Sequence, residues 1–234
     1  PVGFPAWLNW AHFFNMFLMA MIIKTGIDVR REKRPAGYWT SKRGRKISLT
    51  QWLHQTLDIA WVVLGVVFYV LLFTTGQWMR IVPTSWEVLP NAVSAGLQYL
   101  SLDWPDENGW VYYNALQELF YFITVFIASP LAIVSGFRMS SMWPKSWTGV
   151  PVAWARAVHF PTMIYFLVFI AIHVFLVFVG AVVGGHGIFG NLQHMYAASE
   201  DAPWLAFIMF ALSIVAMVAA WFLARPVFLT PIAN

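Results

Sequence analysis

The sequence has no cysteine and few charged residues, since only 10% of its 234 residues are Asp, Glu, Lys or Arg. The absence of thiols excludes disulfides, cysteine-ligated iron–sulfur clusters, thiolate-ligated haem and covalent haem attachment through Cys-x-x-Cys-His. The scarcity of charge excludes a soluble domain of this length. The sequence also has no Gly-rich phosphate-binding loop and no repeat of fixed period.

Long apolar runs are present instead, in a chain that is 60% hydrophobic. Five segments reach the roughly 20 residues that a helix needs to cross about 30 Å of hydrocarbon. They are residues 5–27, 49–76, 112–139, 155–183 and 203–224. Because backbone groups in lipid must bond within their own segment, each should be an α-helix. The sequence therefore predicts one all-α domain over residues 1–234, an integral membrane bundle of five transmembrane helices.

The basic residues lie mostly on one side of these segments. The first connection holds Arg30, Arg31, Lys33, Arg34, Lys42, Arg43, Arg45 and Lys46. Arg138, Lys145 and Arg156 surround the third connection, and Arg225 follows the last segment. The positive-inside rule then places the N-terminus outside and the C-terminus in the cytoplasm of a prokaryotic plasma membrane. Basic residues at helix ends favour contact with anionic lipid or a partner subunit over nucleic-acid binding.

The second connection, residues 77–111, is long and rich in tryptophan. The apolar spacing within residues 86–102 predicts a short interfacial helix that covers the outer end of the bundle. The alternative is a plain loop that joins two membrane helices.

Four histidines lie inside the apolar segments. His159 and His173 are fourteen residues apart in one segment, so they point to within roughly 40° of each other and differ in depth by roughly 21 Å. His12 is near the outer start of the first segment, and His54 is near the inner start of the second. Depth therefore pairs His12 with His173 and His54 with His159.

The pairing of these four histidines by depth indicates that they are metal ligands. A single intramembrane histidine is more often a hydrogen-bonded core residue, but ionisable groups in hydrocarbon are costly and tend to mark function. Four imidazoles at two matched depths predict axial ligation of two stacked b-type haems. Neither the Glu-x-x-His pairs of a carboxylate di-iron site nor the His-Glu-x-x-His motif of a zinc hydrolase occurs.

The pattern resembles the di-haem membrane cytochrome b subunits of formate dehydrogenases, nickel–iron hydrogenases and thiosulfate reductases. The resemblance covers roughly residues 5–183, and the two histidines of one span are its most specific part. It implies the same pairing, and it implies electron transfer between membrane quinone and a partner with a molybdenum-pterin, nickel–iron or iron–sulfur centre. Those relatives usually have four spans and a cytoplasmic N-terminus, in contrast to the five spans and external N-terminus predicted here.

Further residues are candidates for supporting roles. The anionic propionates of a haem need cations nearby. Arg156, Lys42 and Arg138 are the candidates for the inner haem, and Arg80 is the candidate for the outer haem. Gly65, Gly136 and Gly180 could let a helix or a macrocycle approach closely. The candidates for a quinone site or a proton route are Asn9, Asn15, Asp58, Glu118, His186 and His194.

The predicted function is that of a di-haem electron-transfer and anchor subunit that links a partner oxidoreductase to the quinone pool. Whether the chain itself is an enzyme stays open, because the substrate reaction belongs to the partner. One alternative is a self-contained transmembrane reductase of the cytochrome b561 kind, and another is a haem-free membrane anchor.

Overall fold

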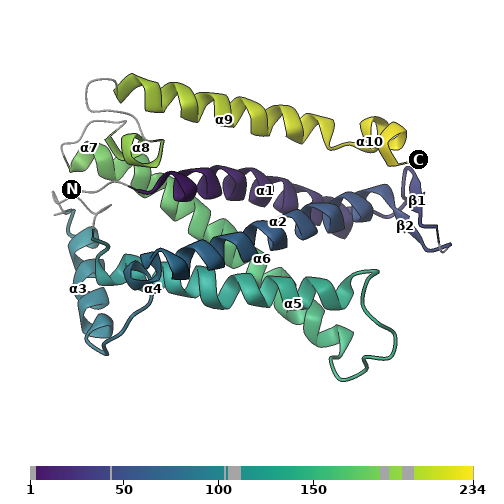
Figure 1. Cartoon of the computed structure of the whole chain (residues 1–234), viewed down its shortest axis with the longest axis horizontal. Helices are drawn as coiled ribbons and strands as arrows, with labels where there is room; N and C mark the ends of the chain where they lie inside the picture. Colours follow the sequence, from purple (N-terminus) through teal and green to yellow (C-terminus); the bar gives the residue numbers. More distant parts are fainter. Residues whose placement is uncertain are drawn as a thin grey trace.

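The computed structural model describes residues 4–42, 44–102, 104, 112–184, 190–196 and 203–233. Its long helices lie side by side along the longest axis of the molecule (Figure 1). Within these described residues, five helical segments are long and apolar enough to cross a membrane, which confirms the predicted fold class and makes the chain a multi-pass membrane protein. The first, second and fifth are α1 (Ala6–Arg31), α2 (Leu49–Thr74) and α9 (Pro203–Leu223).

The third and fourth spans are each interrupted by a π-helical turn. The third consists of α4 (Ala115–Phe122), the π-helix η2 (Ile123–Ala128) and α5 (Ser129–Met139). The fourth consists of α6 (Val152–Phe175), the π-helix η3 (Leu176–Gly180) and α7 (Ala181–Val183). Pro130, the second residue of α5, has no N–H to donate and lies just after η2. The carbonyl of Val125 in η2 accepts from the Tyr69 hydroxyl at 2.5 Å, so a side chain from α2 satisfies it.

Polar residues set the ends of several helices. The Ser48 hydroxyl accepts from the N–H of Gln51 and caps α2. Asn114 and Gln117 form a capping box at the start of α4. α1 continues to Arg31, beyond the predicted boundary, because Arg30 and Arg31 in its last turn favour the negative end of the helix dipole.

The connections contain short elements. The first forms a hairpin of β1 (Tyr38–Thr40) and β2 (Lys46–Ser48), in which Trp39 pairs with Ile47; sequence patterns gave no signal for it. The second contains the 3₁₀ helix η1 (Gln77–Arg80) and the helix α3 (Val88–Leu100), which confirms a short helix within residues 86–102. α8 (Gly190–Met195) precedes α9, and α10 (Pro226–Ala233) ends the described chain.

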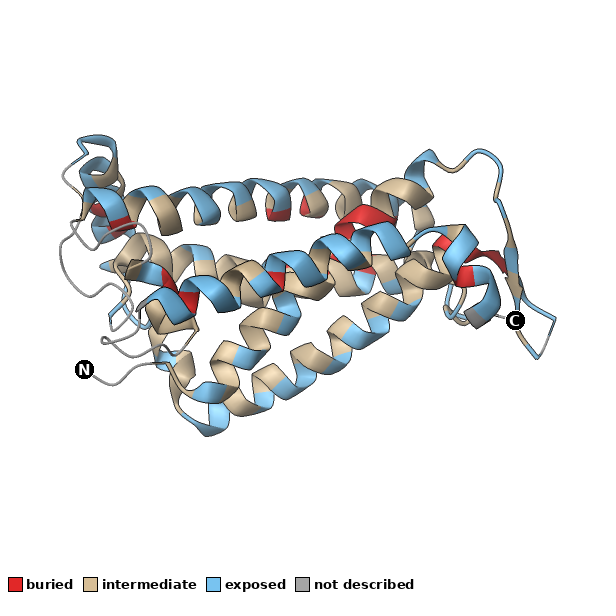
Figure 2. Ribbon diagram, turned by 90° about the horizontal axis from the view of Figure 1, so that it is seen from above, coloured by how far each residue is buried: buried red, intermediate tan, exposed pale blue. Residues whose placement is uncertain are grey.

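Few side chains are fully buried, and large apolar side chains face outward along most helices (Figure 2). This pattern fits a bundle whose outer surface meets lipid instead of water. The buried core consists of Met19, Ile23, Ala128 and Phe166, with Trp61 packed against it. These residues come from α1, η2, α6 and α2, so the core joins the first four spans.

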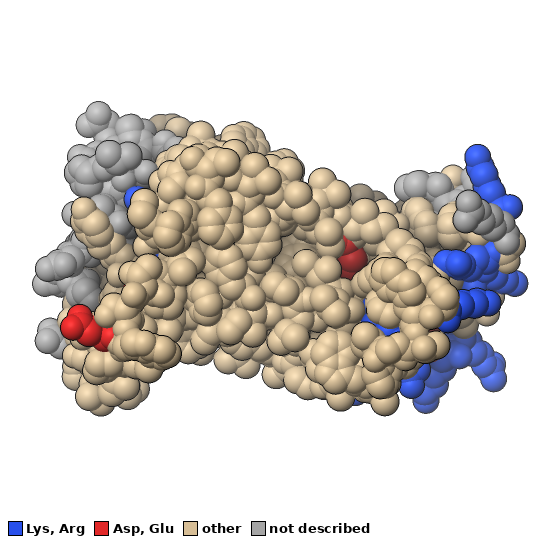
Figure 3. Space-filling view, turned by 60° about the horizontal axis from the view of Figure 1, so that its bottom comes forward, with Lys and Arg blue, Asp and Glu red and all other residues tan. Residues whose placement is uncertain are grey.

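Charge is segregated along the bundle. Lysine and arginine side chains gather at one end, which carries the β1–β2 hairpin and the connection between α5 and α6 (Figure 3). We refer to this as the basic end. The opposite end carries α3 and α8 (Figure 1).

Candidate functional site

The four intramembrane histidines meet in two layers. The imidazole ring centroids of His12 in α1 and His173 in α6 are 6.3 Å apart, with an interplanar angle of 54°. His54 of α2 and His159 of α6 lie within electrostatic range of each other. We call these the outer layer (His12, His173) and the inner layer (His54, His159), of which the inner one is nearer the basic end. Three helices thus supply two pairs of imidazoles.

The outer layer has the dimensions of a bis-imidazole metal site. Imidazoles on opposite sides of one metal ion, with metal–nitrogen bonds of about 2 Å, have ring centroids about 6 Å apart. The observed 6.3 Å matches this separation. The ring of His173 also stacks on Phe169, with a centroid distance of 5.8 Å and an interplanar angle of 4°. The residues of this layer therefore fit an axially ligated b-type haem.

A threonine orients the inner histidine of α2. The Thr25 hydroxyl in α1 donates to the carbonyl of Met21 at 2.8 Å, so its oxygen accepts from the Nδ1–H of His54 at 2.9 Å. The carbonyl of Ile22 also accepts in this region. Acceptors on the Nδ1 side place the proton of a neutral imidazole on Nδ1. The Nε2 lone pair of His54 is then available for a metal.

A serine repeats this arrangement at the other inner histidine. The Ser135 hydroxyl in α5 donates to the carbonyl of Leu131 at 2.5 Å, and its oxygen accepts from the Nδ1–H of His159 at 2.9 Å. Thr25 and Ser135 are both fully buried. The helix pairs α1–α2 and α5–α6 therefore present the two inner imidazoles in the same tautomer, with the same kind of support.

A glycine follows each of these hydroxyl residues. A Cβ atom added to Gly26 would lie 3.2 Å from Cε1 of His54, and one added to Gly136 would lie 3.1 Å from Cε1 of His159. Both distances are tighter than ordinary van der Waals contact. Any larger residue would displace the imidazole beside it. Of the glycines proposed for close approach, Gly136 thus contacts a histidine, whereas Gly65 has nothing within 4 Å of such a Cβ and Gly180 faces Trp104.

Apolar and aromatic side chains fill the space between the layers. Phe166 lies midway in sequence between the two histidines of α6 and is 5% exposed. The ring of Trp61 meets it edge to face at 6.3 Å. The indole N–H of Trp61 donates to the amide oxygen of Asn15 at 2.8 Å, which gives that quinone candidate a packing role between α1 and α2.

Asp58 lies beside the inner layer, as its position one turn after His54 predicts. Its Oδ2 atom is 3.6 Å from Nε2 of His54, beyond hydrogen-bond distance.

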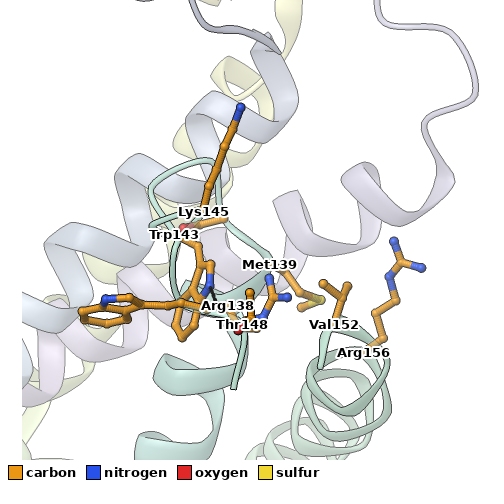
Figure 4. A pocket seen from close by; sticks show the side chains of 9 residues that line it. Arg138, Met139, Trp143, Lys145, Thr148, Val152 and Arg156 are labelled. Carbon is orange, nitrogen blue, oxygen red and sulfur yellow. Dashed lines mark hydrogen bonds between the residues drawn. The ribbon is translucent and has the colours of Figure 1, made fainter. Parts of the chain in front are cut away.

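Two of the three predicted inner cations, Arg138 and Arg156, line an open cavity of about 630 Å³ at the basic end, together with Lys145, whereas Lys42 does not line it. Arg138 comes from the end of α5, Lys145 from the α5–α6 connection and Arg156 from the first turns of α6 (Figure 4). The Arg138 side chain donates to the carbonyl of Val150 and lies over the ring of Trp143. Arg156 precedes His159 by one turn, so this group is the cationic neighbourhood of the inner layer.

The other predicted residues lie toward the opposite end. The Arg80 guanidinium is 5.6 Å from the ring of Phe4, and its Nη1 atom is buried without a hydrogen-bond partner among the described residues. The side-chain amide of Asn9 is similarly buried and unpaired within the described chain. Tyr113, near Arg80, is a neutral phenol because burial raises its pKa to about 12.

Two of the remaining candidates lie in helices. Glu118 lies in the first turn of α4, where a carboxylate favours the positive end of the helix dipole. His194 lies in α8, and His186 falls outside the described residues.

A membrane bundle with paired imidazoles at two depths, and small residues beside them, defines the class of intramembrane b-type cytochromes. A comparison with protein families agrees with this class, because the family model described as prokaryotic cytochrome b561 matches residues 3–191. The chain belongs to that family. It is therefore a transmembrane b-type haem electron-transfer protein. No curated protein and no solved structure matches the chain.

Sequence reasoning missed Thr25, Ser135 and Gly26. The available signal was a hydroxyl residue followed by glycine, Thr25–Gly26 and Ser135–Gly136, near the same end of two spans. Such dipeptides are also common at plain helix contacts. Only the packing of α1 on α2 and of α5 on α6 distinguishes these two.

Proposed function

We propose that this chain is a di-haem subunit that passes electrons between a partner oxidoreductase and membrane quinone. The observation that supports two haems is the presence of two histidine pairs, His12 with His173 and His54 with His159, at different depths of one bundle. Each pair joins two different helices, so each can hold a metal from both sides.

The side chains of this proposal have separate tasks. The four Nε2 atoms would bind iron, while Thr25 and Ser135 hold the inner imidazoles in the required tautomer. Arg156 and Arg138 at the basic end, and Arg80 at the other, are the cations for the haem propionates. A bound b-type haem supplies one-electron chemistry by cycling between ferric and ferrous iron. The apolar spacer around Phe166 and Trp61 excludes water between the layers.

The partner and the quinone role rest on the resemblance of the histidine pattern to the cytochrome b subunits of formate dehydrogenases, hydrogenases and thiosulfate reductases. An electron-transfer subunit needs both an electron donor and an electron acceptor. Quinone is the acceptor or donor that dissolves in the same hydrocarbon. The basic end provides a charged surface on which an acidic partner could dock.

A second candidate is the self-contained reductase of the cytochrome b561 kind, whose name the description of the matched family shares. In that case a small soluble donor would reduce the haem without any partner protein.

Reduction of the purified chain in mild detergent separates the two functions. We expect a water-soluble quinol such as duroquinol to reduce the b-type haem within seconds, as followed by the α-band absorbance. We expect ascorbate to reduce it far more slowly, because no donor site for it is part of the proposal. Rapid reduction by ascorbate with no effect of quinol would support the self-contained reductase, and a purified chain without haem absorbance would contradict both.

We propose that the basic end faces the cytoplasm, with the N-terminus outside. A phosphatase reporter fused after Asn234 should then be inactive, because this enzyme folds only in the oxidising periplasm. The same reporter placed in the connection after α3 should be active. Activity of the C-terminal fusion would overturn the orientation and would place the basic end outside.

A further inference from the structure

The fifth span forms a second polar site beside the inner histidine layer. A cavity of about 480 Å³ lies where α1 and α2 meet α9 and α10, which is within the usual range of small-molecule sites. Its polar wall includes Lys24, Asp28 and Glu32, and its apolar wall includes Trp221 and Leu229. The matched family region ends at residue 191, so α9 and α10 add this site to the bundle that the family defines.

Lys24 is the central polar group of this cavity and is 8% exposed. Its Nζ donates to Oδ2 of Asp28 at 2.5 Å and to the carbonyl of Ala224 at 2.7 Å. The second bond joins α1 to the end of α9. An ammonium group has three N–H donors, so these contacts with the described residues leave one for a ligand.

The cavity adjoins the inner histidine layer. Thr25, which also lines it, accepts the Nδ1–H of His54 at 2.9 Å. A planar ligand against this wall would therefore lie one side chain away from a proposed axial ligand. Asp28 and Glu32 lie about one and two turns after Lys24, in α1 and at its C-cap, in the direction of the basic end. The carboxylate of Glu32 accepts a hydrogen bond from the Thr50 hydroxyl at 2.8 Å.

We infer that this cavity binds the headgroup of a membrane quinone, an inference that rests on the proposed di-haem function. Lys24 donates to one quinone oxygen, while Trp221 and Leu229 cover the ring. Oxidation of a quinol breaks its two O–H bonds, and the two protons pass to Asp28 and Glu32 and on to the basic end. The two electrons would leave in two one-electron steps toward the inner layer, where a bound ferric b-type haem would accept the first electron, pass it to the outer haem and then accept the second.

Two carboxylates distinguish this cavity from an ordinary phosphate site. Its charged lining consists of Lys24, Arg31, Arg225, Asp28 and Glu32, and Lys24 is bonded to Asp28. A phosphate would meet these two anions as well as the three cations. A quinone oxygen needs only a donor, and the ring needs apolar contact.

The test is a fluorescence-quenching titration of the purified haem-containing chain with the quinol analogue heptyl-hydroxyquinoline N-oxide. Ala224→Phe fills the cavity but keeps the backbone carbonyl that Lys24 contacts. Lys24→Met removes the donor. Ala219→Phe is the matched control, because it adds the same ring to an exposed position of α9 outside the cavity. Haem absorbance of each variant verifies the fold, since none of these residues is a proposed ligand.

We expect Ala224→Phe and Lys24→Met each to weaken binding by about tenfold or more, and Ala219→Phe to leave it unchanged. Wild-type affinity in Ala224→Phe would overturn this location, although the di-haem function would stand. If the wild type itself fails to bind the analogue, the quinone role of the proposed function fails as well. Competition by phosphatidylglycerol, but not by phosphatidylcholine, would assign the cavity to an anionic lipid and would also overturn the inference.

Discussion

Alanine in place of His173 or His12 is expected to remove one haem and to leave the other, whereas alanine in place of His54 or His159 removes the second. The physical reason is that the outer and inner layers use different helix pairs and are separated by the apolar core around Phe166. Loss of one imidazole would remove one of the two side chains that would hold the haem of that layer. Pyridine haemochrome assays would count the haem that remains, and redox titration would identify it.

The control is His194→Ala, because His194 lies in α8 outside both layers and should keep the full haem content. Two variants of the same layer should leave the same titration component, and variants of different layers should leave different ones. If every histidine variant loses all haem, the two sites do not bind independently. If His12 and His54 variants lose the same component, the pairing by depth is wrong.

Valine in place of Thr25 is expected to raise the midpoint potential of the inner haem, because it removes the acceptor of the His54 Nδ1–H bond. A weaker hydrogen bond lowers the basicity of the axial imidazole, so ferric iron is less stabilised. One hydrogen bond of about 1 kcal/mol corresponds to a shift on the order of 40 mV for a one-electron couple. The carbonyl of Ile22 remains nearby as a partial substitute. Spectroelectrochemical titration measures the shift.

Ser135→Ala should act in the same direction through His159, and the double variant should shift the potential further because both axial ligands are affected. The matched controls are Thr25→Ser and Ser135→Thr, which keep the hydroxyl and should keep the wild-type potential. A merely structural role would instead lower haem content without changing the potential of the haem that remains. An equal shift in the outer haem would also contradict the assignment, since the hydrogen bond of Thr25 is to a histidine of the inner layer.

The five spans followed from the sequence because their length and apolarity are local properties. A segment in hydrocarbon must satisfy its own backbone, so composition alone predicts a helix there. The π-turns and the β1–β2 hairpin did not follow, because they depend on contacts between segments. Tyr69 satisfies a carbonyl in η2 from another helix, and no pattern within residues 123–128 indicates that partner.

The functional residues divide in the same way. Helical periodicity and depth predicted that His12 pairs with His173 and His54 with His159. In the structure the members of each pair lie near each other. It also gives Asn15 a hydrogen bond to Trp61, a partner that its sequence position did not reveal. Lys24 was overlooked, because a lysine near a helix end usually reaches toward water.

The sequence by itself determined the membrane class, the helix count and the depth of each histidine, since these depend on composition and on the constant rise of a helix. Only the tertiary structure decided which side chains surround those histidines. Thr25 and Ser135 orient imidazoles on neighbouring helices, and α9 encloses a cavity with α1 through Lys24. The rotation and packing of the helices set these contacts. Small residues such as Gly26 and Gly136 allow several helix packings, and only the interactions of the whole bundle determine which one forms.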